Sequence, residues 1–213
     1  MTESIKRGKL IWIEGTDATG KSTQVERISK RLEAAGHSSI AFHEPDGVPI
    51  ASAIRDVIKN GSLERNALTN LLLFSASRRE NWIQLGQQSL LDGTWVLSAR
   101  TSLSTEAYQG DGEGLDSEII QTVTRIATGD DYLNPDLVVV LDIEDEDERT
   151  RRIAERGPLE NPDTFESRDA LFQEKVRQGY RRLARENNYP VISAKQSIDK
   201  VTDDIWDHIQ PLL

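Results

Sequence analysis

The chain of 213 residues contains no cysteine, and it also lacks long apolar stretches. The first absence excludes disulfides, a thiolate nucleophile and cysteine-bound metals, and it is typical of proteins from reducing compartments. The longest apolar runs, such as Leu137 to Leu141, have the length of a strand, whereas a bilayer span needs roughly 20 residues. No signal peptide is indicated behind the N-terminal MTESIKRGK. We therefore expect a cytoplasmic protein without a membrane partner.

Positive charge is also in short supply. The chain carries 36 acidic and 26 basic residues, which gives a net charge of −10. This balance argues against nucleic acid as a partner, because lysine and arginine supply most of the non-specific affinity for duplexes. A local basic pocket can still bind a small anion inside an acidic protein. The length and the apolar content of 37% fit one globular domain over residues 1–213.

Short apolar runs alternate with helical patterns along the chain. The predicted strands are Lys9–Glu14, Ser39–His43, Trp95–Ser98, Leu137–Ile143 and Pro190–Ser193. The predicted helices are Thr23–Ala35, Ile50–Lys59, part of Ala67–Leu91, Ser117–Ala127, Asp169–Asn187 and Asp199–Ile209. Continuous apolar strands indicate a sheet covered on both faces, and alternation with helices indicates parallel strands. We expect an α/β fold with a five-stranded parallel sheet between helices, and loops at Tyr108–Asp116 and Arg156–Thr164.

A phosphate-binding loop follows the first predicted strand. The segment reads Gly15-Thr16-Asp17-Ala18-Thr19-Gly20-Lys21-Ser22-Thr23 and matches G-x4-G-K-[ST]. Its glycines let successive N–H groups point at phosphate oxygens, and the helix that follows adds the positive end of its dipole. Lys21 can reach the β- and γ-phosphates, and the Ser22 hydroxyl can bind Mg²⁺. These residues predict an ATP site.

The loop alone does not choose among GTPases, motor ATPases and small-molecule kinases. A GTPase needs an N/T-K-x-D element, which the sequence lacks. A motor ATPase would carry an Asp-Glu pair at the end of an apolar strand, whereas Asp142 is followed by Ile143. A kinase needs arginines for a second phosphate pocket, placed at strand ends and on nearby helices.

Several segments could form such a pocket, and most of them contain or precede an arginine. They are Phe42–Val48 with Arg55 beyond it, Leu72–Glu80, Ser98–Arg100, Ser104–Gly110, the arginine-rich run Arg149–Arg156 and Phe172–Tyr180. In this order they resemble the thymidylate kinase family of P-loop nucleoside monophosphate kinases, from about Lys9 to Val201. The segments LLFSASR and AYQG beside a P-loop are the specific part of the resemblance.

The resemblance implies transfer of the ATP γ-phosphate to dTMP, giving dTDP and ADP for dTTP synthesis. It also implies Mg²⁺ as cofactor, a small lid over about residues 145–166, and a homodimer built on helices. An apolar stripe including Leu71, Leu72 and Phe74 could serve that dimer or the core. Two alternatives remain: a kinase for another nucleoside monophosphate, and a nucleotide-binding homologue with weak catalysis.

The resemblance also assigns residues of the acceptor site. Phe74 would stack on thymine, Arg78 would bond a base oxygen, and Gln109 would read the base edge, which suits its donating and accepting amide. The remaining dTMP contacts would be Asp17 at the sugar 3′-hydroxyl, Tyr108 beside the sugar, Ser104 and Thr105 along the pocket, Glu44 and Pro45 after strand 2, and Arg55 and Arg100 on the monophosphate. From its place after strand 2, Glu44 could also meet Mg²⁺ through water, and the alternative is that it only caps its loop.

The catalytic charge would come from Lys21, Arg100 and an arginine of the lid. The variable P-loop positions Ala18 and Thr19 carry no arginine, so the family's logic moves that charge to the lid. Arg156 is the best candidate, with Arg152 and Arg149 behind it. The alternative is that these arginines pair with the acidic residues before them on a solvated helix face.

Three departures from the family pattern point to a divergent member with a reduced rate or a shifted acceptor. The family's Asp-Arg-Tyr reads Ala99-Arg100-Thr101, so one carboxylate is missing, and Glu44 or Asp142 could replace it. His43 and Asp46 stand where the R-E-P-G element has arginine and glycine. Thr164 replaces a further arginine after the lid.

Overall fold

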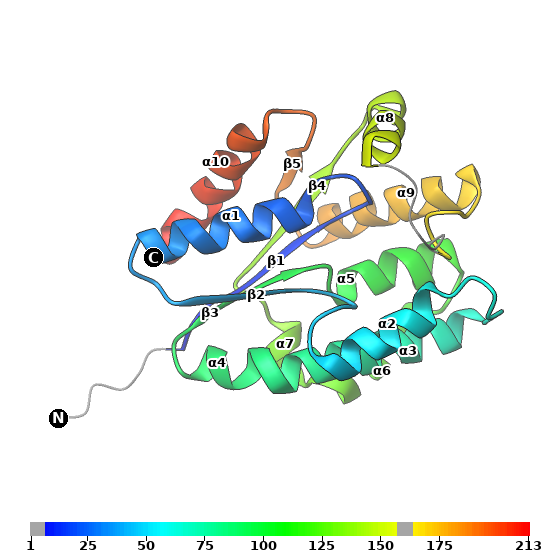
Figure 1. The fold of residues 1–213 in the computed structure, drawn as a ribbon, viewed down its shortest axis with the longest axis horizontal. Helices are drawn as coiled ribbons and strands as arrows, with labels where there is room; N and C mark the ends of the chain where they lie inside the picture. The colour runs from blue at the N-terminus through cyan, green and yellow to red at the C-terminus, as the bar shows by residue number, and fades with distance from the viewer. Residues whose placement is uncertain (1–6, 157–163) are drawn as a thin grey trace.

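A computed structural model describes residues 7–156 and 164–213, without the side chains of Glu146 and Arg156. Its centre is a sheet of five parallel strands in the order β2-β3-β1-β4-β5 (Figure 1). The strands are β1 (Leu10–Gly15), β2 (Ser39–His43), β3 (Trp95–Ala99), β4 (Leu137–Asp142) and β5 (Val191–Ser193). The predicted fold class is confirmed, and each predicted strand overlaps an observed one.

Two helices cover one face of the sheet, α1 (Lys21–Ala34) and α10 (Ile198–Ile209), followed by a short 3₁₀ turn η3 (Gln210–Leu212) (Figure 1). The side chains of Ile11 and Ile13 in β1 point to this face and pack with Ile28 of α1 and Ile205 of α10. Because successive strand residues alternate between faces, Leu10 and Trp12 pack on the opposite side.

The opposite face carries most of the remaining helices. They are α3 (Ala67–Asn81), the π-helical turn η1 (Trp82–Gly86), α4 (Gln87–Leu91), α5 (Ser102–Thr105), the π-helical η2 (Glu106–Gly112), α6 (Ser117–Thr128), α7 (Asp130–Leu133) and α9 (Ala170–Glu186). Helices α2 (Pro49–Lys59) and α8 (Glu146–Arg156) follow β2 and β4. Among the described residues, no helix is long and apolar enough to span a membrane.

The predicted loop at Tyr108–Asp116 is wrong over its first half, which forms η2. Of the glycines that suggested a loop, Gly112 serves close packing, since a Cβ there would lie 2.6 Å from the Phe172 ring of α9. The stretch Ala67–Leu91 is helical throughout, with the π-helical turn at its middle. The short helix α7 was not among the predicted elements, and α8 was foreseen only as the helix face that carries the lid arginines.

Candidate active site

The P-loop lies between the carboxyl end of β1 and the start of α1 at Lys21. A Cβ on Gly15 would lie 2.2 Å from the Leu141 carbonyl oxygen, so only glycine fits there. Gly20 and Ala18 both have positive φ, 86° and 66°, which turns the backbone N–H groups of the loop inward. This geometry can hold a triphosphate.

Lys21 is buried in this loop, where its Nζ donates to the Thr16 carbonyl at 2.6 Å. Burial, with Arg100 nearby, lowers the pKa of Lys21 to about 7, against the opposing charges of Asp17 and Glu14. The side chain therefore sits at the position predicted for phosphate binding, and burial rather than its charged neighbours dominates its pKa.

A cavity of about 330 Å³ opens beside the loop and includes Ser22 in its lining. Every residue predicted to contact the acceptor lines it: Asp17, Glu44, Pro45, Arg55, Phe74, Arg78, Arg100, Ser104, Thr105, Tyr108 and Gln109. The structure thus brings these residues together from five separate stretches of chain, while their individual roles stay predictions. We call Phe74, Arg78, Thr105 and Gln109 the base side, and Lys21, Ser22, Arg55 and Arg100 the phosphate side.

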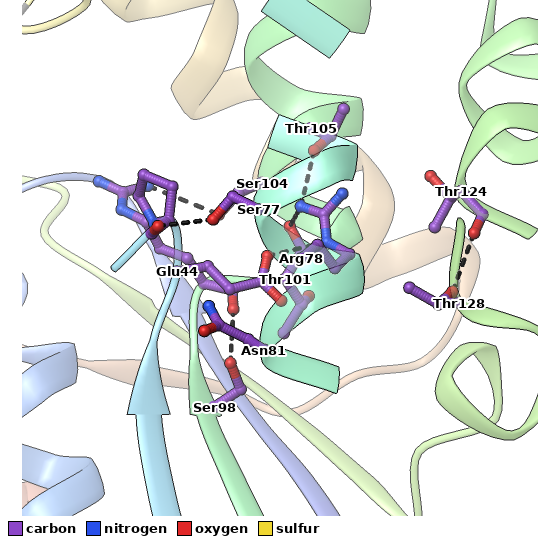
Figure 2. Close-up of polar contacts among 12 residues, drawn as sticks. Glu44, Ser77, Arg78, Asn81, Ser98, Thr101, Ser104, Thr105, Thr124 and Thr128 are labelled. Atoms are coloured by element: carbon purple, nitrogen blue, oxygen red, sulfur yellow. Dashed lines mark hydrogen bonds and ion pairs between the residues drawn. The ribbon is translucent and has the colours of Figure 1, made fainter. Parts of the chain in front are cut away.

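Arg78 organises the base side from α3 (Figure 2). Its Nε donates to Glu44 Oε2 at 2.8 Å, and its Nη2 donates to the Thr101 carbonyl and to Thr105 Oγ1, both at 2.9 Å. The Nη1 atom is buried and has no hydrogen-bond partner among the described residues. A buried cation held in this way leaves the two N–H groups of Nη1 available for an acceptor oxygen in the cavity that Arg78 lines.

Glu44 holds Arg78 in place, and it is held in turn by Tyr132, whose hydroxyl donates to Oε1 at 2.7 Å. Burial raises the pKa of Glu44, while Arg78 and Tyr132 favour its charged form. Both carboxylate oxygens therefore accept a hydrogen bond from the protein, and the predicted contact of Glu44 with the water shell of a metal stays a prediction. The role of Tyr132 was not predicted, because no feature of the sequence around Tyr132 indicates a contact with Glu44 at the end of β2.

Aromatic rings form the rest of the base side. The ring of Phe74 lies 5.6 Å from that of Phe165, which also meets Tyr108 edge-on at 6.0 Å. Gln109 donates from Nε2 to Glu113 at 3.1 Å, which fixes the orientation of its amide. Phe165 and Glu166 also line the cavity, although sequence reasoning gave them no role.

On the phosphate side, Arg100 forms an ion pair with Asp17 of the P-loop. The Tyr108 hydroxyl donates to the other oxygen of Asp17 at 3.0 Å. Burial acts to raise the pKa of Asp17, but Arg100, Lys21 and Tyr108 together bring it well below its usual range. Asp17 is therefore ionised and ready to accept a hydrogen bond from a hydroxyl.

A buried carboxylate that sequence reasoning missed lies directly before the P-loop. Glu14 accepts hydrogen bonds from Thr101 Oγ1 at 2.7 Å, from the Ser104 amide at 3.1 Å and hydroxyl at 2.8 Å, and from the Tyr180 hydroxyl at 3.1 Å. This network ties β1, α5 and α9 together under the cavity. The available signal was an acidic residue inside an apolar strand, which must find donors when buried.

Ala99 stands where the family pattern has a carboxylate. Its side chain is 2% exposed and packs in the apolar cluster on the α1 side of the sheet. Neither predicted substitute stands free. Glu44 is bound as described, and Asp142 accepts from Arg181 at 2.8 Å and is not part of the cavity lining.

The arginines of the predicted lid lie on α8. Arg151 and Arg152 pair with Glu148 at 2.8 Å and 2.7 Å, which matches the alternative of a charged helix face. Arg149 is buried. Arg156 ends α8, and its side chain lies outside the described part of the structure, so its catalytic role stays a prediction.

The residues present suit a metal that arrives with the nucleotide. Among the described residues, no group of three or more His, Cys, Asp or Glu side chains could hold a metal ion alone. Mg²⁺ is commonly bound by few protein oxygens, with phosphates and water completing its shell. The Ser22 hydroxyl at the cavity is one such oxygen, and Glu44 lies in the same lining.

Comparisons with known proteins agree with this geometry. The family model for thymidylate kinase matches residues 13–205. The chain is 35% identical over 204 residues to a thymidylate kinase of Deinococcus radiodurans, covering 95% of this chain and 96% of the relative. It is 37% identical over 206 residues to one of Prochlorococcus marinus strain MIT 9312, covering 93% and 94%. The crystal structure of thymidylate kinase from Ehrlichia chaffeensis has the same fold, with a TM-score of 0.74 at 24% identity over 96% of this chain and 99% of that one.

Proposed function

The chain belongs to the thymidylate kinase family, and from this we propose that it transfers the γ-phosphoryl group of ATP to dTMP, giving dTDP and ADP. The observation that carries the proposal is the cavity beside the P-loop, in which all the predicted acceptor residues meet. Its volume of about 330 Å³ is within the range of small-ligand sites.

We propose that the phosphate side performs the transfer by positioning and charge neutralisation. The phosphoryl group passes in line between two oxyanions, so the protein needs no covalent intermediate. Lys21 would leave the Thr16 carbonyl and bind the β- and γ-phosphates. Arg55 and Arg100 would hold the acceptor phosphate, which suits the forked donors of guanidinium groups. Arg156 would add positive charge from the lid.

The base side supplies the preference for thymine in this proposal. The flat face of Phe74 suits stacking, and the partnerless Nη1 of Arg78 suits a base carbonyl. Gln109 would donate to and accept from the base edge. Tyr108 and Asp17, which are already hydrogen-bonded, would meet the sugar and leave little room for a 2′-hydroxyl.

Mg²⁺, held by Ser22 and the phosphates, would neutralise charge on the β- and γ-phosphoryl oxygens when bound. Glu44 would contact its water shell. Removal of divalent metal with a chelator should therefore abolish turnover, and added Mg²⁺ should restore it.

A panel of acceptors tests the function. ADP release is measured with dTMP, dUMP, dCMP, dGMP and UMP at saturating ATP. A clear preference for dTMP in kcat/KM is expected. Equal rates across the panel would remove the claim of thymine specificity, and binding of both nucleotides without turnover would identify a weak homologue.

The substitution at Ala99 bears on the rate. If the missing carboxylate limits turnover, Ala99→Asp raises kcat with little change in the KM for dTMP. The control is Ala53→Asp, an exposed position on α2 outside the cavity lining. Because Ala99 is buried in the apolar cluster, urea denaturation first checks that Ala99→Asp stays folded; unchanged kcat in the folded variant would mean that this chain has dispensed with the carboxylate.

We also propose a homodimer through α3 and α6, which pack against each other (Figure 1). Leu68 and Leu72 are one turn apart on α3 and expose 46% and 52% of their surface, and Ile119 and Ile126 on α6 expose 45% and 75%. Of the predicted stripe, Leu71 is buried and Phe74 lines the cavity, so only Leu72 is available. Light scattering should give twice the monomer mass, and Leu72→Glu with Ile126→Glu should halve it.

The substrates, ATP and a deoxynucleotide, belong to the cytoplasm, and we propose that location for the protein. Cell fractionation with a tagged chain tests it. Enrichment in a membrane or secreted fraction would contradict the assignment.

A further inference from the structure

The two arginines predicted to hold the acceptor phosphate each face a carboxylate of the same cavity. Arg100 pairs with Asp17. Arg55 Nε lies 3.6 Å from Asp46 Oδ2, an ion pair too long for a hydrogen bond. Asp17 has a predicted use at the sugar, whereas Asp46 stands where the family pattern has glycine and has no assigned use. The ion pair of Asp46 with Arg55 is therefore not accounted for by the predicted roles.

The carboxylate of Asp46 is held in place by its surroundings. Its Oδ1 accepts from the Ser52 hydroxyl at 2.5 Å and from the Gly47 amide at 3.0 Å. The backbone of the same loop is fixed by Asn81, whose amide donates to the Asp46 carbonyl at 2.8 Å and accepts from the Val48 amide at 3.0 Å. Asp46 consequently stays beside Arg55 rather than turning away into solvent.

Among the residues that the structure describes, the charges that line the cavity are balanced. The cations are Arg55, Lys59, Arg78 and Arg100, and the anions are Asp17, Glu44, Asp46 and Glu166. A nucleoside monophosphate adds about two negative charges to this balanced set, since the second pKa of a phosphate ester is near 6. The phosphate must therefore share Arg55 with a carboxylate that is already close to it.

We infer that Asp46 sets the affinity of the acceptor site by competing with the acceptor phosphate for Arg55. The inference rests on the proposed function, because it takes the phosphate of dTMP as the competing anion. Both side chains are partly exposed, 32% for Arg55 and 48% for Asp46, so the pair is weakened by solvent and the competition is modest.

The test uses Asp46→Asn, which removes the charge and keeps an oxygen that can accept from Ser52 and Gly47. Calorimetry measures the binding of dTMP and of thymidine, which has the same base and sugar and no phosphate. Removing the charge should tighten dTMP by about fivefold, the scale of one partly exposed charge pair. Thymidine should bind as before, and the KM for dTMP should fall more than kcat changes.

Two further variants make the result specific to Arg55. Asp56→Asn removes a charge from an exposed position on α2, the helix that carries Arg55, outside the cavity lining. The affinity for dTMP should change by less than twofold in this control. In an Arg55→Met background, Asp46→Asn should lose most of its fivefold effect. If the full effect persists there, simple repulsion acts and competition for Arg55 is excluded.

The remaining outcomes separate failure of this inference from failure of the proposed function. Unchanged or weaker dTMP binding in Asp46→Asn would overturn the inference, and an equal loss for dTMP and thymidine would identify Asp46 as a residue that only shapes the loop. Failure of the unmodified protein to bind or phosphorylate dTMP would instead remove the proposed function itself. The two failures are therefore distinguishable.

Discussion

On the base side of the cavity, Arg78 is 1% exposed and donates hydrogen bonds to Glu44, Thr101 and Thr105. On the phosphate side, the Arg55 side chain is 32% exposed and has a loose ion pair with Asp46. Strain differs as well, since Ala18 of the P-loop and Arg100 both hold a φ of 66°, in the left-handed region. The base side is a buried hydrogen-bonded network in which only Nη1 of Arg78 has no partner among the described residues, and the phosphate side is a set of paired charges and strained backbone.

This difference separates two tasks. Recognition of a neutral base needs fixed donors and rings, which folding can set in advance at a favourable free energy. Binding of phosphates needs cations, which the empty protein must neutralise internally until an anion arrives. We therefore expect substitutions on the base side to change stability, and substitutions on the phosphate side to change turnover or affinity.

The largest expected effect is on turnover. Lys21→Met should lower kcat by about a thousandfold, because it removes a cation from the transferring phosphoryl group. The unfolding free energy should not fall, because the substitution also removes the cost of burying the Lys21 ammonium. Steady-state kinetics and urea denaturation measure both quantities, with Lys30→Met on the exposed face of α1 as control. A kcat within tenfold of the unmodified protein would contradict the expectation that the phosphate side governs turnover.

Arg78→Met should show the opposite pattern. It leaves the buried Glu44 with Tyr132 as its remaining side-chain donor, so the unfolding free energy should fall by about 3–5 kcal/mol. Arg55→Met, its counterpart on the phosphate side, should cost less than about 1 kcal/mol. Adding Glu44→Gln to Arg78→Met should recover part of the loss. Equal costs for the two arginine variants would mean that the two sides are built alike.

The pH dependence of ATP binding sharpens the view of the phosphate side. Burial lowers the pKa of Lys21 to about 7, so the empty loop holds a largely neutral lysine at pH 8. A triphosphate favours the protonated form, and ATP affinity should therefore fall by up to about tenfold per pH unit above pH 7.5. Calorimetry in buffers of different ionisation enthalpy should detect proton uptake, and Lys21→Met should abolish it. A flat profile in the unmodified protein would contradict the shifted pKa.

The smallest expected effect concerns strain. Ala18→Gly removes the cost of a left-handed alanine, which exceeds the added flexibility of the unfolded chain, and should raise the unfolding free energy by about 0.5–1 kcal/mol. Ala53→Gly, an exposed position inside α2, should lower it by a similar amount. Denaturation without nucleotide measures both, and a loss of stability in Ala18→Gly would show that the loop is not strained there.

Much of the site could be predicted because its signals are local. The P-loop glycines, the arginines after strands and the segment AYQG are short patterns, and the parallel topology brings strand ends to one edge of the sheet. The loop predicted at Tyr108–Asp116 was wrong over its first half because its signal was not local. Gly112 is needed there for the close approach of α9, a contact that a local sequence pattern cannot show.

By itself, the sequence determined the fold class and the phosphate loop, since periodicity and spacing express hydrogen bonding and burial along the chain. The resemblance to the family supplied the residues that line the cavity beside this loop. Only the tertiary structure decided how each charge is paired. The partners of Glu44, Glu14 and Arg78 come from elements far away in sequence, as in Tyr132 to Glu44 and Tyr180 to Glu14. A buried charge must find its partner in space, and distance along the chain says nothing about where that partner lies.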